Sequence, residues 1–273
     1  MLIKILLKSL TAFILALSPL KASSETYTIG VVPQFEAREL ADIWGHVATT
    51  LNKNTPYDFA FVGSANIPDF ENKFLNGDFD FIYSNPYHAL TAYQQQGYLP
   101  IIRDGSRLLK GILVAHIDSD IQSVADLDGA LISFPAPNAL GASLMTRSDM
   151  TLKHNITYTE EYVKTHSSAY LNVFLMESDA AGGVMSSYNK LEDEISSELK
   201  IIYETSTVPP HPISAHPRVR AEVVDSFTKT ILTFDNFPNG ENTLSRIPMF
   251  DPVATSIAEY RRLEDLALEK FVK

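Results

Sequence analysis

The chain of 273 residues carries a formal net charge of −11, from 33 acidic and 22 basic side chains, and contains no cysteine. Such an acidic surface argues against nucleic acid or anionic lipid as a partner. The lack of cysteine excludes disulfide bonds, cysteine nucleophiles, thiolate metal sites and a lipidated N-terminal cysteine.

Residues 1–24 have the pattern of a secretory signal peptide. Lys4 places positive charge at the start, residues 5–17 are mostly apolar, and small residues follow at 22–24. The apolar run is shorter than a membrane-spanning helix requires, and an uncleaved anchor is the alternative interpretation. Cleavage would remove three lysines and no acid, so the net charge would move from −11 to about −14. We therefore expect a mature protein that is soluble in the periplasm, without a lipid anchor or membrane insertion.

The first part of the mature chain alternates between predicted strands and predicted helices. Strands are expected where short apolar runs end at proline, glycine or polar turns, at residues 27–32, 57–62 and 79–83. Helices are expected where apolar residues recur every three to four positions, at residues 36–51 and 67–75 and from Pro86 onward. This alternation predicts an α/β fold in which a mostly parallel sheet carries helices on both faces.

The rest of the chain continues this pattern with more irregular connections. The proline-rich run from Val208 to Pro212 can be neither a helix nor a central strand. Further strands are expected at residues 98–103, 109–116, 131–134, 158–165, 182–185 and 199–203. Further helices are expected at residues 139–145, 167–176, 217–234 and 253–271.

Two joints, near residues 103–111 and 205–217, predict a division of the chain into two lobes. A chain that leaves one lobe at the first joint and returns at the second would form a cleft between them. We expect lobe 1 to comprise residues 25–106 and 213–273, and lobe 2 to comprise residues 107–212, with a hinge between the lobes.

Polar turns follow four of the predicted strands, at the sheet edge where ligands of doubly wound folds bind. Hydroxyls, amides and backbone N–H groups at such turns suit an oxyanion, whereas a cation would need carboxylates. Asn138 is expected to cap the helix that follows it, so that free N–H groups and the positive end of the helix dipole would face an anion. The residues expected to line the cleft are Gln34, Phe35, Asn85, Tyr87, Asn138, Ala139, His166, Ser167 and Ser168.

Plain structural roles are the alternative for the same residues. Asn85 would then serve only as a helix cap, Tyr87 would only pack on the core, and His166 would be a capping or surface histidine. The sequence contains no nucleophile elbow, Walker phosphate loop or His-Glu-x-x-His motif. His211 and His216 alone are not expected to hold a metal. No catalytic residue, metal or cofactor is therefore predicted.

Seven short motifs, in their order along the chain, carry a resemblance to a known family. They are Val-Pro-Gln-Phe (32–35), Gly-Asp-Phe-Asp-Phe (77–81), Asn-Pro-Tyr-His (85–88), Asp-Leu-Asp-Gly (126–129), Phe-Pro-Ala-Pro-Asn (134–138), Thr-His-Ser-Ser (165–168) and Pro-His-Pro (210–212). The chain resembles the periplasmic substrate-binding proteins of phosphate, phosphite and phosphonate ABC transporters.

The resemblance implies the two-lobed type II periplasmic-binding-protein fold, with a hinge that closes on a small solute in the cleft. It further implies a monomeric binding protein, not an enzyme, that delivers its ligand to an ABC transporter permease. Three alternatives stand beside this interpretation. The protein would present its ligand to a membrane histidine kinase, act as an extracytoplasmic enzyme on a small phosphate ester, or serve as an adaptor with a vestigial cleft.

The resemblance also assigns site positions and exposes one departure from the family. Tyr87 and His166 match ligand-binding positions of the family, and Asp179 matches one less directly. Where phosphonate binders carry a Ser-Thr-Ser run, this chain has Asn138-Ala139-Leu140, which lacks the three hydroxyls. We therefore expect simple alkylphosphonates to bind poorly and the natural ligand to be a less charged or partly apolar solute.

Overall fold

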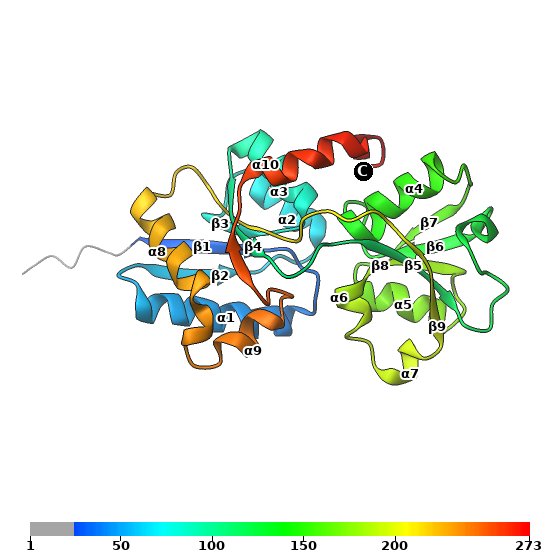
Figure 1. Ribbon diagram of the computed structural model, residues 1–273, viewed down its shortest axis with the longest axis horizontal. Helices are drawn as coiled ribbons and strands as arrows, with labels where there is room; N and C mark the ends of the chain where they lie inside the picture. The colour runs from blue at the N-terminus through cyan, green and yellow to red at the C-terminus, as the bar shows by residue number, and fades with distance from the viewer. Residues whose placement is uncertain (1–24) are drawn as a thin grey trace, which may run out of the picture.

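The computed structural model describes residues 25–273, and the predicted signal peptide lies outside these residues. Two β-sheets, each flanked by helices, lie side by side along the long axis of the molecule (Figure 1). We refer to the sheet on the left of Figure 1, with its helices, as lobe 1 and to the other as lobe 2. Within residues 25–273, every helix is too short or too polar to form a membrane span.

Lobe 1 is built on a six-stranded sheet in the order β11-β4-β10-β3-β1-β2. The strand β1 pairs in parallel with β2 and β3, whereas β10 runs antiparallel between β3 and β4 and β11 runs antiparallel to β4. The strands are β1 (Thr26–Val31), β2 (Asp58–Val62), β3 (Phe81–Tyr83), β4 (Leu99–Asp104), β10 (Ile213–Ala215) and β11 (Pro252–Ala254).

Helices bury apolar stripes on this sheet. On α1 (Ala37–Asn54), residues spaced three and four apart, such as Trp44, Val47 and Leu51, are fully buried. Phe81 of β3 stacks on Phe227 of α8, with their ring centroids 4.2 Å apart. The other helical segments of lobe 1 are α2 (Ile67–Leu75), α3 (Pro86–Gln96), α8 (Ala221–Leu232), η3 (Phe234–Asn236) and α9 (Gly240–Ser245).

Lobe 2 is built on a five-stranded sheet in the order β7-β6-β8-β5-β9. The strand β6 pairs in parallel with β7 and β8, and β5 is antiparallel to both of its neighbours. The strands are β5 (Gly111–His116), β6 (Leu131–Phe134), β7 (Thr159–Tyr162), β8 (Ala180–Val184) and β9 (Leu199–Glu204). The helical segments are η1 (Val124–Leu127), the π-helical η2 (Leu140–Met145), α4 (Thr146–Leu152), α5 (His166–Phe174), α6 (Met185–Tyr188) and α7 (Asp193–Ser196).

The π-helical segment η2 lies unusually close to the sheet of lobe 2. A Cβ atom on Gly111 of β5 would lie 2.0 Å from the carbonyl oxygen of Gly141, and one on Gly182 of β8 would lie 2.0 Å from that of Ala142. Only glycine at these two strand positions leaves room for the helix backbone. This approach holds the start of η2 rigidly at the edge of lobe 2 that faces lobe 1.

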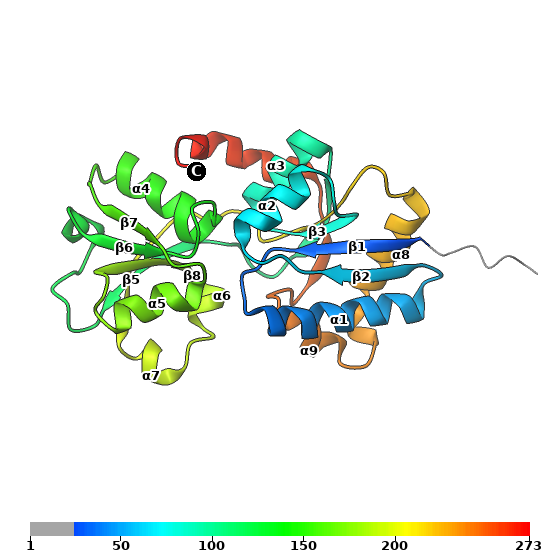
Figure 2. The same cartoon turned by 180° about the vertical axis from the view of Figure 1, so that it is seen from behind.

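Two connections pass between the lobes side by side. Leu109 and Val208 exchange backbone hydrogen bonds of 2.8 Å in both directions, and this isolated bridge ties the outgoing connection to the returning one. A third crossing is the C-terminal segment α10 (Ile257–Tyr260), η4 (Arg261–Leu266) and η5 (Leu268–Lys270), which runs from lobe 1 toward α4 (Figures 1 and 2). There the buried Arg147 side chain donates a hydrogen bond to the Phe271 carbonyl.

Most of the predicted elements are found, but the helix predicted at residues 253–271 is wrong. Val253 and Ala254 belong to β11, which pairs with β4 and forms the edge of the sheet, and helical structure begins only after Ser256. It breaks again at Ala267, whose φ is 49°. The helix predicted at residues 217–234 is shorter, because α8 begins at Ala221.

Candidate functional site

A pocket of about 340 Å³ lies between the two sheets, and we call it the inner pocket. Its walls come from the turns after β1 and β3 in lobe 1 and from η2, α5 and the end of β8 in lobe 2. None of the described residues that line it is acidic. The lining residues are Val32, Gln34, Ile67, Asn85, Leu109, Ala139, Leu140, Gly141, Ala142, His166, Val184 and His211.

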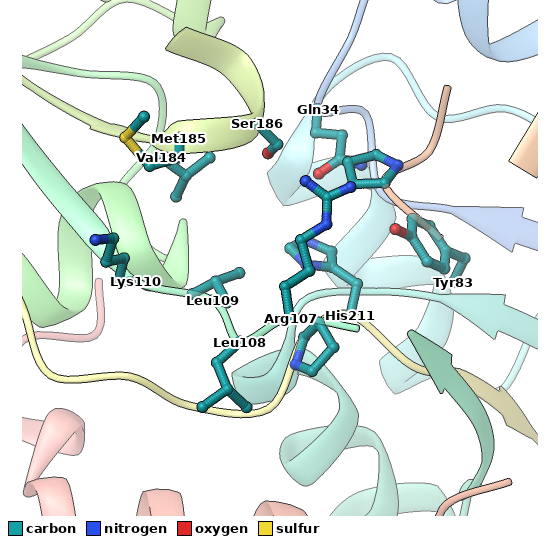
Figure 3. Close-up of a pocket in the computed structure, with 12 residues that line it drawn as sticks. Gln34, Tyr83, Arg107, Leu108, Leu109, Lys110, Val184, Met185, Ser186 and His211 are labelled. Carbon is teal, nitrogen blue, oxygen red and sulfur yellow. The ribbon is translucent and has the colours of Figure 1, made fainter. Parts of the chain in front are cut away.

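A second cavity of about 610 Å³ adjoins the inner pocket, and we call it the outer pocket (Figure 3). The two cavities share Gln34, Leu109, Val184 and His211, so they form one continuous cleft. The outer pocket is further lined by Tyr83, Arg107, Leu108, Lys110, Met185, Ser186, Pro210 and Pro248.

Asn85 has both of the roles that its position suggests. Its side-chain oxygen accepts a hydrogen bond of 2.8 Å from the His88 backbone N–H, and Pro86 occupies the first helical position of α3. Its amide nitrogen donates to the Asn138 carbonyl at 3.3 Å. The turns at Asn85 and Asn138, 53 residues apart in the chain, therefore meet beside the inner pocket.

The prediction that Asn138 caps a helix is wrong. The residue before η2 is Ala139, and no side chain caps this helix. The Asn138 amide instead donates to Glu71 of lobe 1 at 3.3 Å and to the Lys273 carbonyl at 3.0 Å. Because its side chain is turned toward these partners, Asn138 does not line the inner pocket, whereas the neighbouring Ala139 does.

His166 is the first residue of α5 and is 8% exposed. Its Nδ1 atom lies 3.3 Å from Ser187 Oγ, which in turn lies 2.9 Å from the Val184 carbonyl oxygen. This contact leaves Nε2 as the ring nitrogen available to a ligand. Burial lowers the pKa of His166 from 6.5 to about 4, so the empty pocket holds a neutral imidazole at pH 7.

His211 faces His166 from the returning connection and lines both pockets. Its ring lies 5.5 Å from that of Tyr83. Burial, with smaller contributions from the other histidines His88 and His166, lowers the pKa of His211 to about 3. Among the described residues, the lining of the inner pocket thus offers two neutral imidazoles and two side-chain amides, but no fixed charge.

Six of the predicted site residues line neither cavity, and Asn138 is one of them. Phe35 packs on the core of lobe 1 and under Lys190, and Tyr87 packs beside Leu140 and Leu144. Ser167 is exposed, and the Ser168 N–H and hydroxyl are bonded to Thr165, the cap of α5. Asp179 is exposed at the amino end of β8, where it accepts a hydrogen bond from the Leu131 N–H.

The prediction that Asp179 binds the ligand is therefore wrong, since the cleft lies at the other end of β8, where Val184 lines both pockets. Gln34, Asn85, Ala139 and His166 are the predicted residues that the structure brings together in the inner pocket.

The residues that sequence reasoning missed lie on the connections between the lobes. Arg107 and Leu109 come from the outgoing connection and His211 from the returning one. The two joints can be recognised in the sequence as breaks between strands. That the two connections lie side by side at the cleft depends on the Leu109–Val208 bridge. Within residues 25–273, no group of three or more histidine, cysteine or acidic side chains is arranged to hold a metal ion.

Comparison with solved structures identifies the fold. A binding protein component of a phosphonate ABC transporter from Pseudomonas aeruginosa matches with a TM-score of 0.80 at 15% identity, over 90% of this chain and 87% of that one. PhnD1 from Prochlorococcus marinus, in complex with methylphosphonate, matches with a TM-score of 0.81 at 13% identity, over 90% and 98% of the chains. A Xanthomonas citri protein bound to ATP matches with a TM-score of 0.71 at 15% identity, over 92% and 100%.

The two-lobed periplasmic-binding-protein fold predicted from the sequence is thereby confirmed, but its sheets are mixed and not mostly parallel as predicted. No curated protein matches the sequence significantly. A family model described as "ABC transporter, phosphonate, periplasmic substrate-binding protein" matches residues 29–260. The chain therefore belongs to the family of periplasmic substrate-binding proteins of phosphonate ABC transporters.

Proposed function

We propose that this protein captures a phosphonate-like oxyanion in its inner pocket and delivers it to the permease of an ABC importer. The observation that carries the proposal is the meeting of Asn85, Ala139 and His166 in a pocket without an acidic lining residue, in a chain of this family. A carboxylate-free pocket that offers neutral donors favours an anion over a cation.

The donors available to an oxyanion come from both lobes. Asn85 supplies an amide from lobe 1, and His166, in the tautomer whose Nδ1 accepts from the Ser187 hydroxyl, supplies an Nε2–H donor from lobe 2. The first turn of η2, at residues 140–142, contributes backbone N–H groups that lack partners within a helix. A ligand held from both sides would favour the closed arrangement of the lobes.

Contacts between the lobes support hinge closure around the cleft. Asn138 bonds to Glu71 on one side, and on the other side Lys190 donates to Glu39 at 2.8 Å and to the Arg246 carbonyl at 3.1 Å. We propose that lobe 1 comprises residues 25–106 and 213–273, and lobe 2 residues 107–212. The pairing of the two connections at Leu109 and Val208 supports this division.

The remaining parts of the proposal follow from family membership and from the sequence. The protein binds its ligand without converting it, and is a monomer in the periplasm after removal of residues 1–24. The absence of cysteine supports a protein without a lipid anchor. The Asn138-Ala139-Leu140 departure supports weak binding of simple alkylphosphonates.

A thermal-shift screen followed by calorimetry tests the proposal. Phosphate, phosphite, methylphosphonate, 2-aminoethylphosphonate and larger phosphonates are the probes, with arginine as a cationic control. A ligand at 100 times its dissociation constant adds about 2.7 kcal/mol to stability. We expect saturable binding of at least one phosphonate, its recovery unchanged, and none of arginine. Binding of arginine alone, or conversion of a phosphonate, would contradict the proposal.

A further inference from the structure

Arg107 of the outer pocket is fixed in place yet keeps its terminal nitrogens free. Its Nε atom lies 3.5 Å from the buried carboxylate of Asp104, and its guanidinium carbon lies 3.7 Å from the centre of the Phe250 ring. Among the described residues, no hydrogen-bond partner is found for its two Nη atoms. Figure 3 shows the guanidinium within the pocket, near Gln34.

Asp104 contacts the Nε atom of Arg107 and leaves its two Nη atoms available to a ligand. The Asp104 carboxylate is 1% exposed and already accepts hydrogen bonds from Ser106 Oγ and from the backbone N–H groups of Phe250 and Asp251. The Arg107 side chain, by contrast, is 40% exposed. Its Nη donors therefore remain in the geometry that suits two-point binding of a carboxylate.

The other residues that line the outer pocket indicate the chemistry of the rest of the solute. Leu108, Leu109, Val184 and Met185 are apolar, and no acidic residue lines the cavity among the residues described. An ammonium group would find no counter-charge there. The outer pocket opens to solvent, and a bare phosphonate group in the inner pocket would leave its apolar walls uncovered.

We propose that the ligand is a phosphonate that carries a second anionic group, a carboxylate, on a short apolar chain. The phosphonate lies in the inner pocket, the chain crosses Leu109 and Val184, which line both pockets, and the carboxylate pairs with Arg107. This assignment rests on the proposed function, because it places the phosphonate head in the inner pocket. It replaces the expectation of a less charged solute, because a carboxylate on Arg107 gives the chain a source of affinity other than the missing hydroxyls.

Lys110 provides a matched control on the wall of the same pocket. Its Nζ atom is paired with Glu204 at 2.5 Å, and in Figure 3 its side chain extends away from Arg107 and His211. Replacing either residue by glutamine removes one positive charge from the outer pocket. Only Arg107→Gln removes the donors that face the cavity.

Calorimetry with four probes tests the assignment on the wild type, Arg107→Gln and Lys110→Gln. The probes are 3-phosphonopropionate, propylphosphonate, methylphosphonate and 3-aminopropylphosphonate. We expect 3-phosphonopropionate to bind at least tenfold more tightly than propylphosphonate, and 3-aminopropylphosphonate to bind most weakly. Arg107→Gln should remove at least tenfold of the 3-phosphonopropionate affinity and change that for propylphosphonate less than threefold. Lys110→Gln should change both less than threefold.

Two results would overturn the assignment. One is equal affinity for 3-phosphonopropionate and propylphosphonate in the wild type, which would leave the proposed function intact while removing the second anionic group. The other is a similar loss for every probe in Arg107→Gln, which would make Arg107 a structural residue or a partner of the phosphonate itself. If no probe binds the wild type, the proposed function fails together with this inference.

Discussion

The inner and outer pockets share residues but are built from different parts of the chain. The walls of the inner pocket include the backbone of η2, held against β5 and β8 by Gly111 and Gly182, and buried side chains such as His166. The outer pocket is lined by longer side chains from the two connections, including the half-exposed Arg107. A rigid backbone suits the binding of one fixed head group, whereas side chains on the connections can adapt to different substituents of the ligand.

This difference suggests a division of tasks within one cleft. The inner pocket would recognise the oxyanion that all ligands of the protein share, and the outer pocket would select the substituent. Mutations in the inner pocket should then affect every ligand, and mutations in the outer pocket only some of them. Variants of single residues can test this difference between the two pockets.

The largest effect is expected from Gly111→Ala. The new Cβ would lie 2.0 Å from the Gly141 carbonyl oxygen. Relief of this clash requires a movement of the backbone, because the oxygen is a backbone atom and the Cβ is bonded directly to the backbone. We expect a loss of about 3 kcal/mol in the free energy of unfolding and weaker binding of all ligands. Chemical denaturation and calorimetry measure the two effects. Gly45→Ala, in α1 with no atom within 4 Å of the new Cβ, is the control and should not destabilise. Equal stability of the two variants would show that η2 is not held by this close approach.

Asn85→Asp should weaken ligand binding through the loss of its amide donor. A carboxylate keeps the oxygen that caps α3, but it loses the donor to the Asn138 carbonyl and brings negative charge to the inner pocket. We expect stability to fall by about 1–3 kcal/mol and the affinity for every phosphonate to fall at least tenfold. Asn66→Asp is the matched control, because Asn66 caps α2 through the Asp69 N–H and does not line the inner pocket. An unchanged affinity in Asn85→Asp would remove Asn85 from the binding site.

The buried His166 should make the empty protein sensitive to acid. Because its pKa is about 4 when folded and 6.5 ordinarily, the unfolded chain takes up a proton between these values while the folded chain does not. The stability is therefore complete above pH 6.5 and is lost as the pH falls toward 4.

Between pH 7 and pH 5, the His166 contribution to this loss should be about 2 kcal/mol. His166→Gln should lose less stability than the wild type over this interval by about that amount, as measured by urea denaturation at both pH values. His211 should add an effect of similar size, since burial lowers its pKa to about 3. Parallel pH profiles for the wild type and His166→Gln would contradict a neutral, desolvated His166.

The smallest effect is expected from Lys190→Met, which weakens a contact between the lobes outside both pockets. The Lys190–Glu39 pair is about one-third exposed, so its contribution to closure should be about 0.5 kcal/mol. The affinity for all phosphonates should therefore fall two- to threefold without a change in selectivity. Lys200→Met, whose side chain bonds only to the Ile117 and Ser119 carbonyls of lobe 2, should leave the affinity unchanged. An equal effect of both variants would argue against closure through Lys190.

Local sequence signals were sufficient for most of the elements and for part of the inner pocket. Apolar periodicity located α1, and the capping residue Asn85, followed by Pro86, marked the start of α3. Because the carboxyl ends of parallel strands meet at one edge, the turns that carry Gln34, Asn85 and His166 could be expected to meet. These signals depend on neighbouring residues or on a general rule of the fold.

The failures depend on long-range contacts that no local pattern contains. The strand β11 has only three residues and exists because β4 offers a free edge. Asn138 has the residue type of a cap, but the distant Glu71 and Lys273 bind its side chain. Arg107 carries no signal of its own, since its placement requires Asp104 and Phe250, 146 residues apart, to meet behind it.

A crystal structure of the protein with 3-phosphonopropionate would show which anionic group each pocket binds. We expect the phosphonate oxygens within hydrogen-bonding distance of the Asn85 amide and His166 Nε2, and the carboxylate against the Arg107 guanidinium. The reversed orientation, with the phosphonate on Arg107 and the carboxylate or no ligand atom in the inner pocket, would contradict this expectation.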